Sequence, residues 1–586
     1  MSRRKQKKIK FCLKPLAANL LLSLGLSTAA LAGPQGGVIR AGTANIEYNG
    51  TQTQIQQSSE RAVIDWRSFG VAPLESVIFN QPSRLSATLN RVTGDQISAI
   101  HGKITANGQV ALINPNGIIF GAGAQINVGS LIASTANISN NNFMDGRLVF
   151  DQAGKPGASI LNRGTISAAE GGLVALVAPT VRNDGVIQAR LGKVVLGAGD
   201  TFTLDLYGDQ LINLALAPEQ AMQLFDAEGQ PVTSLIAQAG RIEADGGQVV
   251  LITAPTAKAV LDQVINMSGT IRADSIAEQN GRIVLLGAGG TVTVSGKLSA
   301  QGTQTGQRGG NIEVLGDHVT LAASANLDAS GAAGGGTIHV GGAFQGGGDT
   351  YRAQNTDIAP GTRLSASATD TGNGGEVVVW SDQQTRFAGH IEARGGPQGG
   401  NGGQLEVSGK GTLEFLGTAD ASAAQGRAGA LLLDPANVNF GLAEAALISR
   451  VLRTGTSTTV QASNNIDVNA LIDGRGRIAG GGLTLTAGNN LNINEFIVTN
   501  NGAIHLNAGN TINVAADKAV FAGTAPITAT SRGDLNTAPL ITTGPVTYRS
   551  TAGSVPNPIP EPGSLALLGV ALGALGMARR RRAASP

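Results

Sequence analysis

The sequence has little of what most stabilising or catalytic chemistry requires. Its 586 residues include one cysteine, Cys12, which lies in an N-terminal leader, so the mature chain has no disulfide and no thiol nucleophile. Aromatic residues make up 3% of the chain and charged residues 14%, against roughly 25% charged residues in an average protein. Lys and Arg cluster at the two ends, and the body between them is mildly acidic. We therefore expect no nucleic-acid partner.

Motifs for metal, nucleotide or hydrolase chemistry are also missing. The five histidines are far apart in the sequence, and none has the spacing of a metal ligand: His101, His318, His339, His390 and His505. No Walker-type phosphate loop occurs, and no Gly-x-Ser-x-Gly elbow stands between a strand and a helix. We expect no metal and no cofactor.

Glycine, in contrast, supplies 83 residues, about twice the average usage of roughly 7%. From residue 160 onward a phrase recurs: Gly, any residue, an aliphatic residue, any residue, Ala, a Gly-rich gap, and then alternating aliphatic residues. The aliphatic position returns at intervals that are mostly in the high twenties: Ile271, Leu298, Leu327, Leu364 and Ile391. So short a repeat cannot bury its own apolar face and must stack on the next.

We therefore predict an all-β chain folded as a right-handed parallel β-helix. In this fold the aliphatic residues and Ala point inward, Gly takes the corners, and the variable residues face solvent. The rod is expected over residues 151–520, with an extra-helical segment near 203–238 that forms a strand pair and a short helix or loop. Asparagine-rich repeats toward its end predict side-chain ladders at the corners. Residues 521–558 are rich in Thr, Pro and Ser without clear periodicity and are expected to be a linker.

Residues 1–32 have the layout of a secretory signal peptide. A basic region precedes an apolar core near residues 16–26, and Ala30-Leu31-Ala32 forms a cleavage site before Gly33. The apolar core is shorter than the roughly 20 residues that a bilayer span requires, which disfavours a retained anchor. We expect export through the inner membrane and cleavage by signal peptidase.

Residues 559–586 place a short apolar run between Pro560-Glu561-Pro562 and four arginines. By the positive-inside rule the arginines stay cytoplasmic while the apolar run is held in the inner membrane; a buried C-terminal helix is the alternative. The segment resembles the PEP-CTERM sorting tail of Gram-negative bacteria, which implies processing by a membrane exosortase. The residues that carry this resemblance are Pro560, Glu561, Pro562, Arg579, Arg580, Arg581 and Arg582.

Residues 33–150 occupy the end of the rod, where unpaired strand edges need a cap. Several motifs occur there in a fixed order: Asn90-Arg91-Val92, Gly102-Lys103-Ile104, Asn107-Gly108-Gln109-Val110, and Asn114-Pro115-Asn116-Gly117-Ile118. This region resembles the N-terminal secretion domain of filamentous haemagglutinin-like exoproteins. The resemblance implies two-partner secretion, in which a separate outer-membrane β-barrel transporter recognises the domain and exports the chain.

The tetrapeptide Asn114, Pro115, Asn116, Gly117 is predicted to be a tight turn, because Pro115 lacks an N–H and Asn-Gly favours positive φ. Two interpretations remain open. The turn shapes a corner of the cap, or it forms part of the secretion signal that the transporter reads.

Two functions fit a solenoid with these features. One is a surface-displayed or secreted adhesin that binds glycan, matrix or other cells through many weak contacts along the rod. The other is a polysaccharide-active enzyme, which needs paired carboxylates on one outer face. Carboxylates that could align across coils are Glu243, Asp245, Asp274, Glu313 and Asp328. We favour the adhesin, because solvated outward charge is the simpler explanation of these residues.

Overall fold

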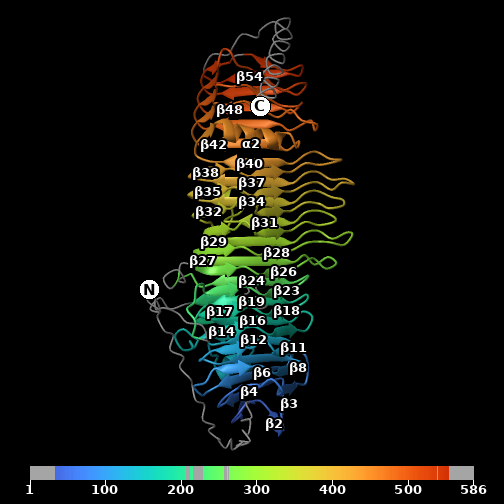
Figure 1. Ribbon diagram of the computed structural model, residues 1–586, viewed down its shortest axis with the longest axis vertical. Coiled ribbons are helices and arrows are strands. Elements are labelled where there is room, and N and C mark those ends of the chain that lie inside the picture. The colour runs from blue at the N-terminus through green and yellow to red at the C-terminus, as the bar shows by residue number, and fades with distance from the viewer. Residues whose placement is uncertain are drawn as a thin grey trace, which may run out of the picture.

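The described chain forms an elongated rod of stacked coils, with its N-terminal coils at one end and its C-terminal coils at the other (Figure 1). The computed structural model describes residues 33–205, 212–215, 229–255, 261, 263–537 and 539–552. The predicted signal peptide and the sorting tail lie outside these residues. Most coils carry three strands, which we assign to a first, second and third face in chain order. Each strand pairs in parallel with strands one coil away, which confirms the parallel β-helix.

The first face comprises β4 (Arg61–Trp66), β6 (Ala87–Val92), β9 (Gln109–Ile113), β12 (Ser130–Ser134), β16 (Leu173–Ala178), β19 (Lys193–Ala198), β24 (Gln248–Thr253), the start of β27 (Arg282–Val294) and of β29 (Asn311–Leu321), β31 (Thr337–Val340), β34 (Glu376–Ser381), β37 (Gln404–Gly409), β40 (Ala430–Asp434), β42 (Ser457–Ala462), β45 (Leu483–Ala487), β48 (Ile504–Ala508), β51 (Ile527–Ser531) and β54 (Val546–Ser550).

The second face comprises β7 (Ser98–Ile100), β10 (Ile118–Phe120), β14 (Ser159–Asn162), β17 (Thr180–Asn183), β22 (Ile236–Gln238), β25 (Gln263–Met267), the ends of β27 and β29, β32 (Asn355–Ile358), β35 (Gln384–Phe387), β38 (Thr412–Phe415), and then β41 (Val438–Phe440), β43 (Ile466–Val468), β46 (Leu491–Ile493), β49 (Ile512–Val514) and β52 (Leu535–Asn536).

The third face comprises β3 (Gln52–Gln57), β5 (Ser76–Asn80), β8 (Lys103–Ala106), β11 (Gln125–Val128), β15 (Thr165–Ala168), β18 (Val186–Gln188), β23 (Arg241–Glu243), β26 (Thr270–Arg272), β28 (Lys297–Ser299), β30 (Asn326–Asp328), β33 (Arg363–Ser365), β36 (His390–Glu392), β39 (Thr418–Asp420), and then β44 (Ile472–Asp473), β47 (Ile497–Val498), β50 (Val520–Phe521) and β53 (Leu540–Ile541).

The repeated aliphatic position forms the inner wall of the third face. Its residues stack in register and are buried: Val77, Ile104, Ile126, Ile166, Ile187, Ile242, Ile271, Leu298, Leu327, Leu364 and Ile391. The repeated alanines that follow are fully buried as well: Ala244, Ala273, Ala300, Ala329, Ala366 and Ala393. The period found in the sequence is therefore the length of one coil.

The glycine before each first-face strand from β9 to β40 is required by close approach of successive coils. A Cβ on Gly403 would lie 2.0 Å from the Gly375 carbonyl oxygen, and one on Gly310 would lie 2.1 Å from that of Gly281. The Gly-rich gaps form loops that project at this corner and stack on one another (Figure 1). In one example, the Gly374 N–H donates to the Asn401 carbonyl oxygen across 2.8 Å.

Antiparallel strands cover the N-terminal end of the rod. β1 (Val38–Ala41) pairs with β4, and β2 (Ala44–Asn49) pairs with β3, both antiparallel. Two excursions from the corner between the first and second faces lie farther along the rod. One carries the short helix α1 (Asn140–Met144) and β13 (Val149–Phe150). The other carries β20 (Thr201–Leu204) and β21 (Ile212–Ala215), which form an antiparallel sheet with β13. This strand pair begins the segment expected to leave the rod near 203–238.

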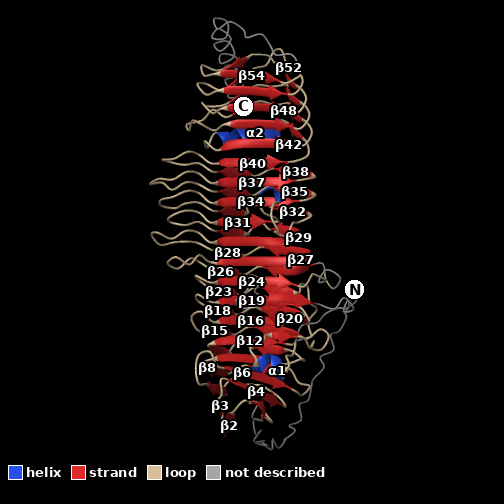
Figure 2. Cartoon of the chain, turned by 180° about the vertical axis from the view of Figure 1, so that it is seen from behind, coloured by secondary structure: helices blue, strands red, loops and turns tan. Residues whose placement is uncertain are grey.

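One element was not predicted from the repeat. Helix α2 (Leu442–Leu452) lies between β41 and β42 and takes the place of a third-face strand, so the sheet that ends at β39 resumes only at β44 (Figure 2). Its buried residues Ala445, Ile448 and Leu452 recur at helical spacing and join the core of the rod. In the part of the chain that the structure describes, no helix has both the length and the apolar character of a membrane span.

The predicted linker over 521–558 is wrong for residues up to 550. β51, β52, β53 and β54 continue the three faces and pair in parallel with the coil before them. The sequence concealed this because β52 and β53 are two residues long, too short for alternation to be visible.

Asparagine ladders also form, but in mid-strand as well as beside corners. The Asn492 amide donates to Asp467 across 2.7 Å and the Asn513 amide donates to Asn492 across 2.8 Å.

Candidate functional site

The Asn-Pro-Asn-Gly turn connects β9 to β10 at the corner between the first and second faces. Asn114 is fully buried, and its amide donates to the Gln96 carbonyl and to Ser98 Oγ, both across 2.9 Å. Its Oδ1 accepts from the Asn116 backbone N–H across 2.9 Å and from the Asn116 amide across 2.7 Å. The Asn116 amide also donates to the Gly94 carbonyl oxygen across 2.9 Å.

The same turn is held from the other side. The Asn114 N–H donates to the Ser134 carbonyl across 3.0 Å, and the Lys155 N–H donates to the Pro115 carbonyl across 2.9 Å. Gly117 has a φ of +122°, and a Cβ there would lie 3.0 Å from the Ser159 carbonyl oxygen. The turn therefore joins three successive coils, and most of its polar groups are engaged within the cap.

The outward side of the third face carries a row of polar side chains in register from coil to coil. The row consists of Ser167, Gln188, Glu243, Arg272, Ser299, Asp328, Ser365, Glu392 and Asp420. Since each strand contributes one member, the spacing is that of the sheet, roughly 4.8 Å. We call this the third-face row. It presents polar groups along the rod at a regular interval.

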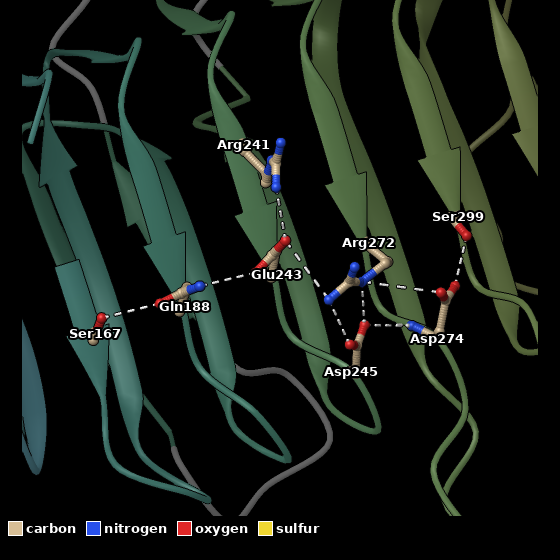
Figure 3. Close-up of polar contacts among 8 residues, drawn as sticks. All are labelled: Ser167, Gln188, Arg241, Glu243, Asp245, Arg272, Asp274 and Ser299. Carbon is tan, nitrogen blue, oxygen red and sulfur yellow. Dashed lines mark hydrogen bonds and ion pairs between the residues drawn. The ribbon is translucent and has the colours of Figure 1, made fainter. Parts of the chain in front are cut away.

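Ion pairs join the middle of this row (Figure 3). Ser167 donates to Gln188 across 3.2 Å, and the Gln188 amide donates to Glu243 Oε2 across 2.9 Å. Arg241 lies 3.3 Å from Glu243 Oε1, and Arg272 lies 3.6 Å from the same oxygen. Burial opposes ionisation of Glu243, but the hydrogen bond from Gln188 and the charges of the two arginines hold its pKa below the ordinary value.

Arg272 is the centre of this network. It binds Asp245 through two hydrogen bonds, Nε to Oδ1 at 2.9 Å and Nη2 to Oδ2 at 2.8 Å. The hydrogen bond to Asp245 raises the pKa of Arg272. On its other side Arg272 Nε lies 4.0 Å from Asp274 Oδ2. Burial raises the pKa of Asp274, although Ser299 donates to it across 2.5 Å and the Gln301 N–H across 2.8 Å.

An open polar groove of about 730 Å³ lies beside Arg272 and is lined by Arg190, Asp245, Asp274, Glu278 and Gln307, among others. We call it the Arg272 groove. Two carboxyl groups with opposite pKa shifts are the usual arrangement for glycosidic bond cleavage. Here Arg272 stands between Glu243 and Asp274, and both of its hydrogen bonds go to a third carboxylate, Asp245. The arrangement therefore favours a charged binding surface over an acid–base pair.

Of the five carboxylates expected to align, Glu243 and Asp328 lie in the third-face row, whereas Asp245 and Asp274 lie in the corner that follows β23 and β26. Asp328 accepts from the Gln301 amide across 2.5 Å. Glu313 lies on the first face instead, where its Oε1 is 3.1 Å from Arg282. Among the described residues, no group of three or more histidine or acidic side chains has the geometry of a metal site.

Two glutamates with shifted pKa values were missed by sequence reasoning. Glu392 on β36 is paired with Arg363 and Arg394, and although burial opposes ionisation, the hydrogen bond with His390 and these charges lower its pKa to about 2. Glu406 on β37 is buried, and burial raises its pKa to about 7, with Asp434 and Glu376 adding to the effect. Glu392 occupies the outward position that recurs in the third-face strands, so the repeat could have identified it. Glu406 is covered by the loop around η3 (Phe344–Gly346), which no local pattern indicates.

Comparisons with known proteins agree with this architecture. Residues 32–300 match the model of the TPS secretion domain, and residues 558–582 match the PEP-CTERM protein-sorting motif. The chain is similar to the crystal structure of the HMW1 secretion domain from Haemophilus influenzae, with a TM-score of 0.56 and 32% identity, covering 67% of this chain and 99% of that one.

Two curated relatives are named Heme/hemopexin-binding protein, and both come from Haemophilus influenzae. One is 34% identical over 261 residues and the other is 30% identical over 266 residues, which is 43% and 42% of this chain. The chain spans 27% of the length of each. With the capped β-helix, the secretion-domain match and the sorting motif together, this chain belongs to the filamentous haemagglutinin-like exoproteins of two-partner secretion and carries a PEP-CTERM sorting tail.

Proposed function

We propose that the chain is a surface-displayed or secreted adhesin that binds glycan, matrix or other cells through its rod. A separately encoded outer-membrane β-barrel transporter moves it across the outer membrane. Signal peptidase removes residues 1–32, and an exosortase processes the tail near Pro560. The observation that carries the binding proposal is the third-face row, which offers hydrogen-bonding groups in register over nine coils from Ser167 to Asp420.

The chemistry of the row suits an extended polyhydroxylated ligand. Its carboxylates accept hydrogen bonds from hydroxyl groups, and its serines and the Gln188 amide both donate and accept. Its one arginine, Arg272, is held in place by Asp245. Each contact is weak because most of the row is only partly buried and stays in contact with water. Repetition along the rod adds these contacts together and increases avidity.

Binding of the secreted, purified chain to immobilised glycans tests this proposal. Haem and hemopexin are included as ligands because they are the ligands in the names of the curated relatives. The double variant Arg241→Gln, Arg272→Gln on the third face is expected to bind glycan at least about tenfold more weakly. Arg386→Gln on β35 is the matched control, since Arg386 also pairs with two acids, Asp357 and Glu414, but on the second face.

The same experiment separates the adhesin from a polysaccharide-active enzyme. An adhesin leaves the glycan intact, whereas an enzyme releases oligosaccharides that mass spectrometry detects. Equal glycan binding by the third-face variant and the control variant would contradict the role of the third-face row.

A further inference from the structure

The second face of the rod is interrupted between β38 and β41. β38 pairs with β35 in the coil before it, and β41 pairs with β43 in the coil after it. Among the described residues, no backbone hydrogen bond joins β38 to β41, and the two strands belong to different sheets. The first face continues past this point, since β40 pairs with both β37 and β42. We call the gap between β38 and β41 the second-face break.

The edge of β38 at the second-face break has free backbone groups. The N–H groups of Thr412 and Leu416 donate to the neighbouring coil on the side of β35. Successive residues of a strand direct their backbone groups to opposite sides, so those of Leu413 and Phe415 point toward the break. An extended peptide can add to such an edge, where main-chain hydrogen bonds supply affinity and pockets for alternate side chains supply specificity.

A cavity of about 160 Å³ opens at the second-face break. Its apolar lining comes from β38, β41, α2 and the inner side of the first face: Leu413, Phe415, Leu433, Val438, Phe440 and Ile448. Leu413 and Val438 pack against the core and are only partly buried, because the wall is open beside them. A cavity of roughly 150 Å³ lined by Leu, Ile and Phe holds a benzene ring, so this cavity has room for one aromatic side chain.

The inner side of β35 and β38 indicates which side chain fits the cavity. Phe387 stacks on Phe415 in register, with ring centroids 5.6 Å apart and planes 7° from parallel. The cavity lies at the next position of this stack, and Phe440 of β41 lines it from the other edge of the break. An aromatic ring in the cavity therefore continues the stack from Phe415 toward Phe440.

The outer side of the same strands carries alternating charge up to the second-face break. Asp357, Arg386 and Glu414 are in register on β32, β35 and β38, and Arg386 lies 3.3 Å from each carboxylate. Glu414 ends this row with its side chain 51% exposed. The described lining of the cavity includes a second carboxylate, Glu444, and no Lys or Arg. A cation is therefore the complementary group at the next outward position, beside Glu414.

We propose that the second-face break binds an extended peptide segment of a partner protein, in which an aliphatic residue, a Lys or Arg, and an aromatic residue follow one another. The segment pairs in parallel with the edge of β38 and places these residues beside Leu413, Glu414 and Phe415. The break lies outside residues 32–300, which match the secretion domain, and on a different face from the third-face row. The inference goes beyond the proposed glycan binding and does not depend on it.

Binding of labelled peptides to the secreted, purified chain tests the proposal. The probe is the peptide Thr-Ile-Lys-Phe-Ser, blocked at both ends, and the comparison peptide is Thr-Ile-Glu-Phe-Ser. The wild type is expected to bind the lysine peptide at least about fivefold more tightly, and Glu414→Lys is expected to reverse this preference. Asp357→Lys is the matched control, because Asp357 is 53% exposed and also pairs with Arg386, but β32 has a neighbouring strand on each side.

Two further peptides test strand pairing and the cavity. Methylation of the lysine backbone nitrogen removes the N–H that donates to the Leu413 carbonyl oxygen in the proposed pairing, and is expected to weaken binding at least about fivefold. Alanine in place of the phenylalanine leaves the cavity empty and is expected to weaken binding at least about tenfold. Both changes are in the peptide, so neither alters the folding of the chain.

Reversal of the charge preference by Glu414→Lys but not by Asp357→Lys, together with weaker binding of both altered peptides, supports the proposal. Three results overturn it. They are the absence of lysine-peptide binding by the wild type, the same charge preference in Glu414→Lys as in the wild type, and unchanged binding of the N-methylated peptide. Because both substituted side chains are about half exposed, the two variants are expected to have equal melting temperatures.

Discussion

Asn183 donates its side-chain amide to Gln238 Oε1 across 2.7 Å, although 55 residues separate the two in the sequence. The bond joins β17 to β22, which are neighbouring strands of the second face. Asn162 extends the ladder by donating to Asn183 Oδ1 across 2.7 Å, and all three side chains are fully buried. The long excursion that carries β20 and β21 therefore leaves the coils on either side of it in direct contact.

This buried ladder predicts a stability effect. Asn183→Ala removes both hydrogen bonds and leaves Asn162 and Gln238 without the partners they now have. Since a buried polar group without a partner costs roughly 1–3 kcal/mol, we expect the free energy of unfolding to fall by about 2–3 kcal/mol in chemical denaturation. Asn513→Ala in the ladder of β49, which is partly exposed, is the control and is expected to cost under about 1 kcal/mol.

The close approach of Gly403 to the neighbouring coil predicts that a side chain at this position is destabilising. Gly403→Ala places a Cβ 2.0 Å from the Gly375 carbonyl oxygen, so two coils must separate. We expect a loss of about 3 kcal/mol of stability, the upper end of the roughly 1–3 kcal/mol that small-to-large changes in close packing cost, or loss of soluble protein. Gly347→Ala is the comparison, because its Cβ would meet nothing nearer than 3.3 Å. Thermal unfolding of both variants measures the difference, and equal melting temperatures would show that the coils are not in this contact.

The raised pKa of Glu406 predicts that part of the free energy of unfolding is lost as pH rises. Its pKa is raised to about 7 from an ordinary value of 4.5, so the folded chain holds a proton that the unfolded chain releases between these values. The stabilisation is complete below pH 4.5 and is lost as pH rises to about 7, an effect on the order of 3 kcal/mol. Glu406→Gln should remove this dependence. Denaturation at pH 5 and pH 8 checks it, and an unchanged pH profile in the variant would contradict the assignment.

The lowered pKa of Glu392 predicts the opposite dependence of stability on pH. Its pKa is lowered to about 2, so its contribution is present above pH 4.5 and is lost as pH falls toward 2. Glu392→Gln is expected to destabilise the chain on the order of 3 kcal/mol at pH 7, because Arg363 and Arg394 lose their shared acid, and to have little effect near pH 2. Glu414→Gln is the control: its side chain is about half exposed beside Arg386, and surface pairs contribute roughly 0–1 kcal/mol.

The repeat made much of the fold predictable from the sequence. Ile271, Leu298 and Leu327 were placed on one inner wall because each must stack on the next coil, and the structure pairs them in register. Local sequence patterns did not predict the structure of coils in which a strand is replaced or very short. Helix α2 replaces a strand without changing the path of the coils, and β52 and β53 are too short to show alternation.

The candidate surfaces were less predictable. The sequence suggested that outward carboxylates align, and two of the five, Glu243 and Asp328, lie in the third-face row. It could not show that Arg272 lies between Glu243 and Asp274. Glu313 belongs to the first face because it follows a Gly-rich gap, whereas the other four carboxylates precede one. The packing of α1 over β6, β9 and β12 was also not predictable, because it is a contact between segments that no repeat connects.

Two-partner export is tested most directly by the intact mass and location of the mature chain in its own host, with and without the transporter gene. We expect a species in the culture supernatant or on the protease-accessible surface that begins at Gly33, ends near Pro560 and disappears when the transporter is deleted. A membrane-held species that keeps Arg579 to Arg582 and resists external protease would contradict two-partner export of this rod.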